Sequence, residues 1–360
     1  MTPATHGSTS DGGASLDDEA AADLARAAEA GIHCIALPTP FQVGTVNTYL
    51  IEDDPLTLLD SGPNMGTALD ALERGLAQYG RRIEDLELIV ISHQHIDHLG
   101  LVQILARRSG AQVAAIDLLA PWVARYDDGM ESDDAFANRV MTEHGIPEDM
   151  RIALLTLSHA YRGWGAAATV TRPLPDGSEL ALRDRTLRVL HRPGHSSSDT
   201  IFHDARRGIV LGADHLIKHI SSNPLIARPL DAPIDGADPP DRPHALETYM
   251  RSLRATRAMD DVELILPGHG DPVTGHAALI DERFRMHERR AEKIHGLIDE
   301  QPRTAYELAQ ALWGDVAVAQ AYLTLSEVLG HMDLLLAEGR AVEEREGAVV
   351  RFAAGGGALA

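Results

Sequence analysis

The sequence has a single cysteine, Cys34, among its 360 residues. One cysteine cannot form an internal disulfide, which is typical of a protein from a reducing compartment. No apolar run approaches the roughly 18 residues that a membrane-spanning helix requires. The first twenty residues have neither a basic start nor an apolar centre, so we expect no secretory signal there. Together these absences predict a cytoplasmic protein without a membrane partner.

Positive charge is also scarce. The chain has 32 Lys and Arg against 54 Asp and Glu, which gives a formal net charge of −22. A field of this sign keeps a protein soluble and opposes non-specific contact with phosphate backbones and anionic lipids. The count is compatible with a local basic groove, but it disfavours a nucleic-acid partner.

Short apolar runs alternate with helical patterns and predict an α/β class. A first series of strands and helices runs from residue 33 to residue 116, and a second series of strands runs from 168 to 216. A helix from residue 244 and one more strand near 262–267 follow. Two strand-rich halves, each with helices, predict a four-layer αββα sandwich over residues 31–280.

Two segments fall outside this pattern. Residues 1–30 predict a disordered tail followed by a short helix from residue 16. Residues 117–165 are helical, rich in Met and aromatic residues, and too long for a simple connection, so we expect a lid or a pocket wall. A packed helical pair without substrate contact is the alternative. Tyr126, Tyr161 and Trp164 either line an apolar acyl pocket or pack in the core.

The composition changes again over residues 281–360. Three helical patterns are followed by an alternating segment around a glycine turn, which predicts a small winged-helix-like domain. Residues 281–351 contain 9 Lys or Arg and 14 Asp or Glu, a balance of −5, whereas a DNA-reading domain has the opposite sign. We therefore expect this domain to pack on the catalytic domain or to pair two subunits as a homodimer.

The segment SHQHIDHLG, residues 92–100, places three imidazoles and a carboxylate directly after the apolar run LELIVI. Imidazole and carboxylate are standard zinc ligands, and a loop that leaves a buried strand can hold several of them. Four candidates exceed what one tetrahedral ion takes from a single loop once distant ligands are added, so two ions are favoured. The candidates are His93, His95, Asp97 and His98.

Three further candidates follow other predicted strands. His195 lies in RPGHSSSDT, Asp214 in VLGADHL and His269 in LILPGHGDP. Each has a glycine at or beside the candidate ligand, which lets the backbone approach the site closely. The chain has 18 histidines, and the strand-end position with glycine separates these few from the rest.

The motif HQHIDH followed in order by PGHS, GADH and PGHG resembles the metallo-β-lactamase-fold hydrolases, from about residue 33 to residue 272. The resemblance implies two zinc ions, although iron or manganese is compatible with the same ligands. It also implies an orienting role for Asp60, for which an ordinary turn residue is the alternative. The implied ligands are His93, His95 and His195 for one ion, Asp97, His98 and His269 for the second, and Asp214 between them.

The resemblance further implies a binuclear metal-dependent hydrolase. A metal-bound hydroxide would attack the substrate, and Asp97 would accept the proton as the intermediate collapses. Lys218 and His219 follow Asp214 in the sequence and could bind a substrate carboxylate or an oxyanion. An exposed lysine and a packed histidine are the alternative for these two residues.

The substrate is predicted less sharply, because a fold does not determine it. True β-lactamases of this superfamily are exported and typically have cysteine where Asp214 stands, so that branch is disfavoured. A thioester, ester or lactone is favoured, as in relatives resembling hydroxyacylglutathione hydrolase, with a small acyl substrate linked to CoA, glutathione or a carrier. An endoribonuclease or other phosphodiesterase is the first alternative, and an iron-dependent dioxygenase relative is the second.

Overall fold

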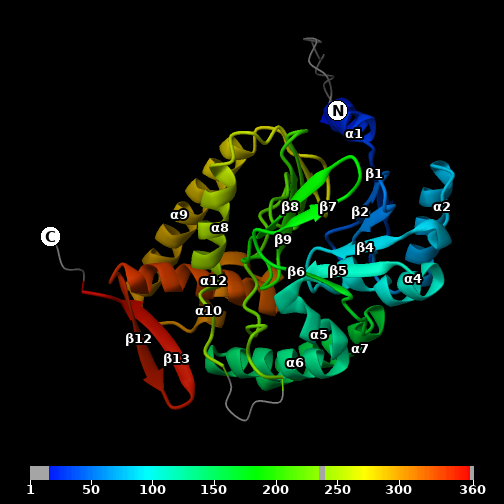
Figure 1. The fold of residues 1–360 in the computed structure, drawn as a ribbon. Coiled ribbons are helices and arrows are strands. Elements are labelled where there is room, and N and C mark those ends of the chain that lie inside the picture. Colours follow the sequence, from blue (N-terminus) through cyan, green and yellow to red (C-terminus); the bar gives the residue numbers. More distant parts are fainter. Residues whose placement is uncertain (1–15, 235–239, 357–360) are drawn as a thin grey trace, which may run out of the picture.

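The computed structural model describes residues 16–234 and 240–356, and two sheets form its centre (Figure 1). The first sheet has six strands in the order β1-β2-β3-β4-β5-β6. β1 to β3 are antiparallel neighbours, whereas β3 to β6 are parallel. Its strands are β1 (Ile32–Leu37), β2 (Val46–Ile51), β3 (Thr57–Leu59), β4 (Leu88–Ile91), β5 (Gln112–Ile116) and β6 (Arg172–Leu174).

The second sheet has five strands in the order β11-β10-β9-β8-β7. β10 and β11 are parallel, and the other neighbours in this sheet are antiparallel. The turn at 205–208 joins β9 to β10 as a hairpin. Its strands are β7 (Glu179–Ala181), β8 (Thr186–His191), β9 (Thr200–Asp204), β10 (Ile209–Ala213) and β11 (Leu264–Pro267).

β4 shows why an uninterrupted apolar run suits the middle of this fold. Ile89 and Ile91 face the helices on the outside of the first sheet, whereas Leu88 and Val90 face the second sheet. Successive side chains of a strand point to opposite faces, so a strand that is covered on both faces needs apolar residues throughout.

Helices cover both outer faces of the paired sheets. α2 (Gly66–Gln78) and α4 (Val102–Ser109) pack on the first sheet, with the short helix η1 (Ile83–Asp85) between them in sequence. α8 (Ala245–Arg257) and the start of α9 (His276–Glu300) pack on the second sheet. The predicted αββα sandwich is therefore confirmed. α1 (Leu16–Glu29) contacts β1, and the tail expected at 1–15 lies outside the described residues.

The segment 117–165 is helical, as predicted. α6 inserts Phe136 and Val140 into an apolar cluster that it shares with the C-terminal helices. α6 is thus packed in the interior, and contact of the segment with substrate stays a prediction. The elements of the segment are η2 (Asp117–Leu119), α5 (Ala120–Ala124), α6 (Tyr126–Glu143), α7 (Glu148–Tyr161) and η3 (Arg162–Trp164).

The three aromatic residues of this segment have different environments. Tyr126 is buried in the core, and its hydroxyl donates to the Arg162 carbonyl, so it takes the core position rather than a pocket wall. Tyr161 and Trp164 stack with their ring centroids 4.4 Å apart. Phe41 lies edge-on to both of these rings.

The C-terminal region continues directly from the sandwich. The predicted boundary at residue 281 falls inside α9, so one helix passes from one predicted domain into the next. Thr304 begins α10 with a capping box, in which its side chain and that of Glu307 satisfy each other's backbone N–H groups. The elements after α9 are α10 (Ala305–Trp313), α11 (Val316–Ala319), α12 (Ala321–Ala337), β12 (Ala341–Glu346) and β13 (Val349–Ala354).

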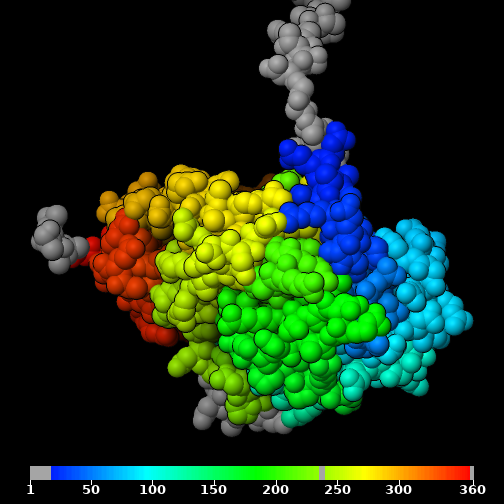
Figure 2. All heavy atoms as spheres, turned by 45° about the horizontal axis from the view of Figure 1, so that its top comes forward, coloured from blue at the N-terminus to red at the C-terminus, as the bar shows by residue number. Residues whose placement is uncertain are grey.

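Figure 2 shows the C-terminal region, in orange and red, against the segment of α8 and α9 and away from the first sheet, in blue and cyan. The apolar cluster beneath this contact joins α9, α10 and α12 with the hairpin β12-β13. Within the two described ranges, no helix is both long enough and apolar enough to cross a lipid bilayer.

Candidate metal centre

Four strand ends meet at one edge of the sandwich. β8, β10 and β11 run in the same direction in the second sheet, and the loops that follow them carry His195, Asp214 and His269. β4 of the first sheet ends at Ile91, and the next loop and the one-turn helix α3 (Ile96–Leu99) carry the HxHxDH motif. The sandwich thus brings together all seven side chains that the sequence nominates as ligands.

The first cluster consists of His93, His95 and His195. The distance from His95 Nδ1 is 3.1 Å to His93 Nε2 and 3.0 Å to His195 Nε2. Two nitrogens that bind one zinc ion at about 2.0–2.1 Å in tetrahedral geometry lie roughly 3.3 Å apart. The three ring nitrogens therefore have the spacing of a set of metal ligands.

Asp214 lies between this first cluster and a second one, which consists of Asp97, His98 and His269. Asp214 Oδ2 is 3.4 Å from the Nε2 atoms of both His195 and His269, and its Oδ1 is 3.4 Å from His98 Nε2. Asp97 Oδ2 is 3.4 Å from His269 Nε2. The Asp214 carboxylate therefore faces ligand atoms of both clusters.

The hydrogen bonds at Nδ1 of His195 and His269 determine whether the Nε2 atoms of these rings can bind a metal ion. His269 Nδ1 donates to the Thr45 carbonyl at 2.8 Å, and His195 Nδ1 donates to the Asn223 carbonyl at 3.1 Å. In a neutral imidazole the other nitrogen then carries a lone pair. In the neutral form that binds a metal ion, these rings direct their Nε2 lone pairs at the oxygens of Asp214, and a cation between them would satisfy all of these acceptors.

Two buried atoms of the centre also indicate a site for a cation. His98 Nε2 and Asp214 Oδ1 have no hydrogen-bond partner, although buried polar groups normally have one. A Cβ atom at Gly268 would overlap Asp214 Oδ1 and His98 Cε1, so glycine is required for this close approach. The donor set and its orphaned atoms therefore fit bound divalent metal ions.

Asp60 orients one of these rings. Its Oδ2 accepts from His98 Nδ1 at 2.8 Å and from the Ser92 hydroxyl at 2.7 Å, and its Oδ1 accepts from the Ser92 backbone N–H at 2.8 Å. Ser92 Oγ in turn is 2.9 Å from His93 Nδ1. Asp60 has a left-handed backbone (φ 58°), a conformation that a non-glycine residue adopts at an energetic cost. Asp60 therefore acts on both clusters through a network that includes Ser92, which the sequence analysis missed.

The two clusters differ in electrostatics. Burial lowers the pKa of His95 to about 3, with a further contribution from His195, so the His95 imidazole is neutral near pH 7. Burial alone would also lower the pKa of His269, but Asp214 and Asp97 raise it to about 10. Burial opposes ionisation of Asp214, yet His98 and His269 hold its pKa well below the ordinary value. In the second cluster, ionised carboxylates thus raise the pKa of the imidazole beside them, and a bound divalent cation would take the place of the imidazole proton.

Lys218 and His219 lie beside this centre. His219 is half exposed, and its Nε2 is 2.8 Å from Asp271 Oδ2. The Lys218 carbonyl accepts from Arg283, which also donates to the carbonyls of Ile217 and Ile220. Among the contacts of the described residues, none joins the side chain of Lys218 or His219 to the two clusters, so their catalytic roles stay predictions.

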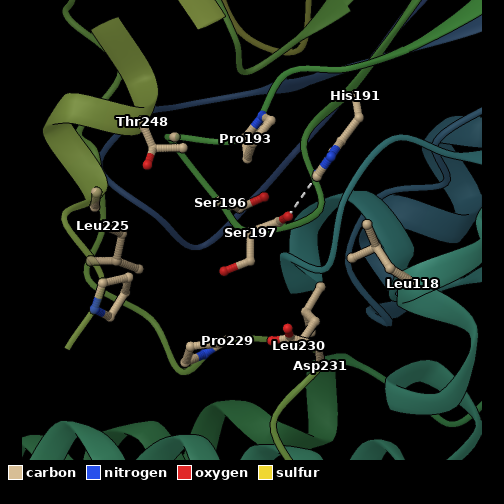
Figure 3. A pocket seen from close by; sticks show the side chains of 13 residues that line it. Leu118, His191, Pro193, Ser196, Ser197, Leu225, Pro229, Leu230, Asp231 and Thr248 are labelled. Atoms are coloured by element: carbon tan, nitrogen blue, oxygen red, sulfur yellow. Dashed lines mark hydrogen bonds between the residues drawn. The ribbon is translucent and has the colours of Figure 1, made fainter. Parts of the chain in front are cut away.

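A cavity of about 300 Å³ adjoins His195, since the neighbouring residues Gly194 and Ser196 form part of its wall. This volume is at the lower end of small-molecule pockets, which are about 300–1,000 Å³. In Figure 3 the His191 ring reaches the Ser197 carbonyl, with Nε2 and the oxygen 2.9 Å apart. The remaining wall is mainly apolar and consists of Leu118, Pro193, Leu225, Pro229, Leu230, Asp231, Pro243, Ala245 and Thr248.

Comparisons with known proteins agree with this geometry. The model of the metallo-beta-lactamase superfamily matches residues 42–269. The chain is 34% identical over 318 residues to the probable metallo-hydrolase YqjP of Bacillus subtilis, covering 88% of this chain and 96% of that protein. A metallo-beta-lactamase family protein of Thermus thermophilus, TTHA1429, superposes with a TM-score of 0.75 at 25% identity, over 90% of this chain and 98% of that one. A beta-lactamase domain protein of Burkholderia ambifaria has the same fold, with a TM-score of 0.74 at 23% identity over 90% and 92% of the two chains.

Proposed function

Since this chain belongs to the metallo-β-lactamase superfamily, we propose that it is a hydrolase that uses two zinc ions to cleave a thioester, an ester or a lactone. One observation carries the proposal. Seven side chains from four strand ends bring their ligand atoms to spacings of 3.0–3.4 Å, with Asp214 facing both clusters. The relative from Bacillus subtilis is described as a probable metallo-hydrolase, which supports hydrolysis as the reaction class.

We assign the ligands as the two clusters divide them. His93, His95 and His195 would hold one ion, Asp97, His98 and His269 would hold the other, and Asp214 lies between the two clusters. When bound, a pair of zinc ions lowers the pKa of a water molecule and polarises the oxygen of the scissile carbonyl. Asp97, whose side chain is about 10% exposed, accepts the proton that the attacking water loses and returns it to the leaving group.

The net charge of the chain and the wall of the cavity beside His195 both support an acyl substrate. The net charge of −22 opposes the approach of a polyanion such as RNA. The cavity beside His195 has a mainly apolar wall, which suits an uncharged part of a small substrate better than a phosphate group. We therefore propose a small acyl compound linked to CoA, glutathione or a carrier as the substrate, and the cytoplasm as its location.

Two measurements test this proposal. Metal analysis of the purified protein should find two zinc ions per chain, and a panel of acyl thioesters, esters and lactones should contain at least one substrate. Asp97→Ala should abolish the turnover. Asp70→Asn is a matched control, because Asp70 is an exposed carboxylate on α2 that pairs with Arg74 and does not contact the clusters. Cleavage of single-stranded RNA without turnover of any acyl compound would refute the proposed substrate class, and absence of bound metal would refute the mechanism.

A further inference from the structure

Large apolar side chains are exposed on two loops that bind the ligand histidines and on the helices next to those loops. Eight such side chains are exposed in the described part of the chain, and five of them belong to the loop 38–45, the loop 215–225, α11 and the start of α12. These five, which we call the entrance rim, are Val43, Ile220, Val316, Val318 and Leu323, each 38–49% exposed.

The first loop connects the metal centre with the C-terminal region. Its Thr45 carbonyl accepts the hydrogen bond from His269 Nδ1 at 2.8 Å. Three residues earlier, Gln42 Oε1 accepts from Gln320 Nε2 at 2.7 Å, at the residue that joins α11 to α12. Val43 directly follows Gln42, and α11 directly precedes Gln320, so the contact between these two glutamines joins the two parts of the rim.

The second loop makes an equivalent connection on the other side of the centre. The Asn223 carbonyl accepts from His195 Nδ1, and the Asn223 side-chain amide donates to the Leu323 carbonyl at 2.9 Å. The neighbouring Ser222 hydroxyl donates to the Asp214 carbonyl at 2.5 Å. Leu323 follows Gln320 by about one helical turn, so one turn at the start of α12 contacts both loops.

In Figure 1, α12 runs from the middle of the molecule, where the sandwich edge lies, toward the hairpin β12-β13. The start of α12 thus reaches across the edge of the sandwich at which the seven ligands converge. We propose that the entrance rim binds the apolar acyl chain of the substrate, so that α11 and the first turn of α12 complete the active site. This inference rests on the proposed function.

The chemistry of the rim favours an acyl chain over other parts of such a substrate. Valine, isoleucine and leucine side chains offer no charge or hydrogen bond to a phosphate or a carboxylate. Removing apolar surface from water is favourable, and each fully buried methylene of a chain raises affinity about fourfold. Exposed apolar groups that gather at one place on a protein commonly mark a binding surface.

The test compares rim variants with matched exposed residues elsewhere. We would measure kcat/KM of the zinc-loaded protein for a series of thioesters that share one thiol and differ in acyl chain length. Leu323→Ser and the double variant Val316→Ser/Val318→Ser should lower kcat/KM about tenfold for long chains and much less for the acetyl thioester, which has no methylene chain to bury. Ile152→Ser on α7 and Val342→Ser on β12 should change neither, because both residues are exposed but belong to other segments.

Three results would overturn the inference. Equal effects of the rim variants on short and long chains would show that the rim does not contact the chain. A loss of chain-length preference in Leu230→Trp, with the rim variants unaffected, would place the acyl chain in the cavity beside His195. A change from dimer to monomer in the rim variants, measured by light scattering, without a change in chain preference would make the rim an interface between two copies.

A binding measurement separates this inference from the proposed function. Calorimetry with a non-hydrolysable alkyl thioether series should show tighter binding of longer chains, and the rim variants should remove that trend. If the trend is found but no acyl compound is hydrolysed, the rim stands and the proposed reaction fails. If acyl compounds are hydrolysed but chain length does not affect binding, the rim inference fails and the proposed reaction stands.

Discussion

Within residues 16–234 and 240–356, buried histidine and acidic side chains gather at the edge of the sandwich and again between α9 and α12. The second group consists of His287, Glu327 and His331. Its two imidazoles are as close as those of the metal centre, with His287 Nδ1 3.2 Å from His331 Nε2. Proximity of ligand-type residues therefore does not distinguish the two groups.

The difference lies in the partners of each polar atom. His331 Nδ1 donates to the Glu327 carbonyl at 2.6 Å, so its Nε2 accepts from His287, and Arg290 forms an ion pair with the Glu327 carboxylate. Among the described residues of this group, only His287 Nε2 is left without a partner. At the sandwich edge, by contrast, the Nε2 atoms of three histidines lie 3.4 Å from the oxygens of Asp214, and His98 Nε2 and Asp214 Oδ1 have no hydrogen-bond partner. We expect metal ions at the edge and a self-sufficient structural network between the helices.

The largest expected effect comes from removing the carboxylate that faces both clusters. Asp214→Asn should lower kcat/KM about a thousandfold and reduce the metal content, because the substitution removes a negative charge that faces both clusters. Glu327→Gln is the corresponding change between α9 and α12 and should leave metal content and activity unchanged. Mass-spectrometric metal analysis and kinetics check both variants. Loss of a metal ion from Glu327→Gln would show that the group between α9 and α12 also binds metal.

The ion pair between the helices should matter for stability instead. Arg290→Met leaves the Glu327 carboxylate, whose side chain is only 8% exposed, without its cation, so the free energy of unfolding should fall by about 3 kcal/mol. Arg340→Met, which breaks a surface pair with the 65% exposed Glu292, should cost less than about 1 kcal/mol. Urea denaturation measures both. Equal losses would mean that burial does not govern these pairs.

Asp60 offers a finer test of the metal centre. Asp60→Asn weakens the acceptor for His98 Nδ1 and for Ser92, so zinc affinity should fall about 10- to 100-fold. Asp53→Asn is the matched control, since Asp53 is a buried carboxylate that binds Arg185 rather than a candidate ligand. Competition with a chromophoric chelator measures the affinities. An unchanged zinc affinity in Asp60→Asn would make Asp60 an ordinary turn residue.

The smallest effect concerns pH. Burial lowers the pKa of His287 from the ordinary 6.5 to about 3, with help from His331 and Arg290. Between these values the unfolded state binds a proton at this residue that the folded state does not, so the residue reduces stability as the pH falls. His287→Phe should therefore reduce the slope of unfolding free energy against pH by about 1.4 kcal/mol per unit between about pH 4 and 6. Urea denaturation at several pH values checks this, and an unchanged slope would show that His287 already binds a proton when folded.

The strand-end criterion explains how the sequence separated the two groups of histidines. His93, His195 and His269 follow apolar runs, and the last two are flanked by glycine, whereas His287 and His331 lie within long helical patterns. The same criterion could not find Thr45 or Asn223, because they contribute backbone carbonyls, and every residue has one. Ser92 could have been noticed, since it directly precedes His93 and its hydroxyl is a hydrogen-bonding group.

Residue types and periodicity were sufficient to predict the layered fold, the seven candidate ligands and the helical segment at 117–165. Each strand, helix and ligand motif is specified by residues that lie close together in the sequence. The packing of α6 on the C-terminal helices, the continuity of α9 through residue 281 and the closeness of α12 to the metal centre appeared only in three dimensions. These features depend on contacts between distant segments, such as His269 with Thr45, which are 224 residues apart. A local pattern specifies which groups a segment presents, whereas the partner of each group depends on how the whole chain packs.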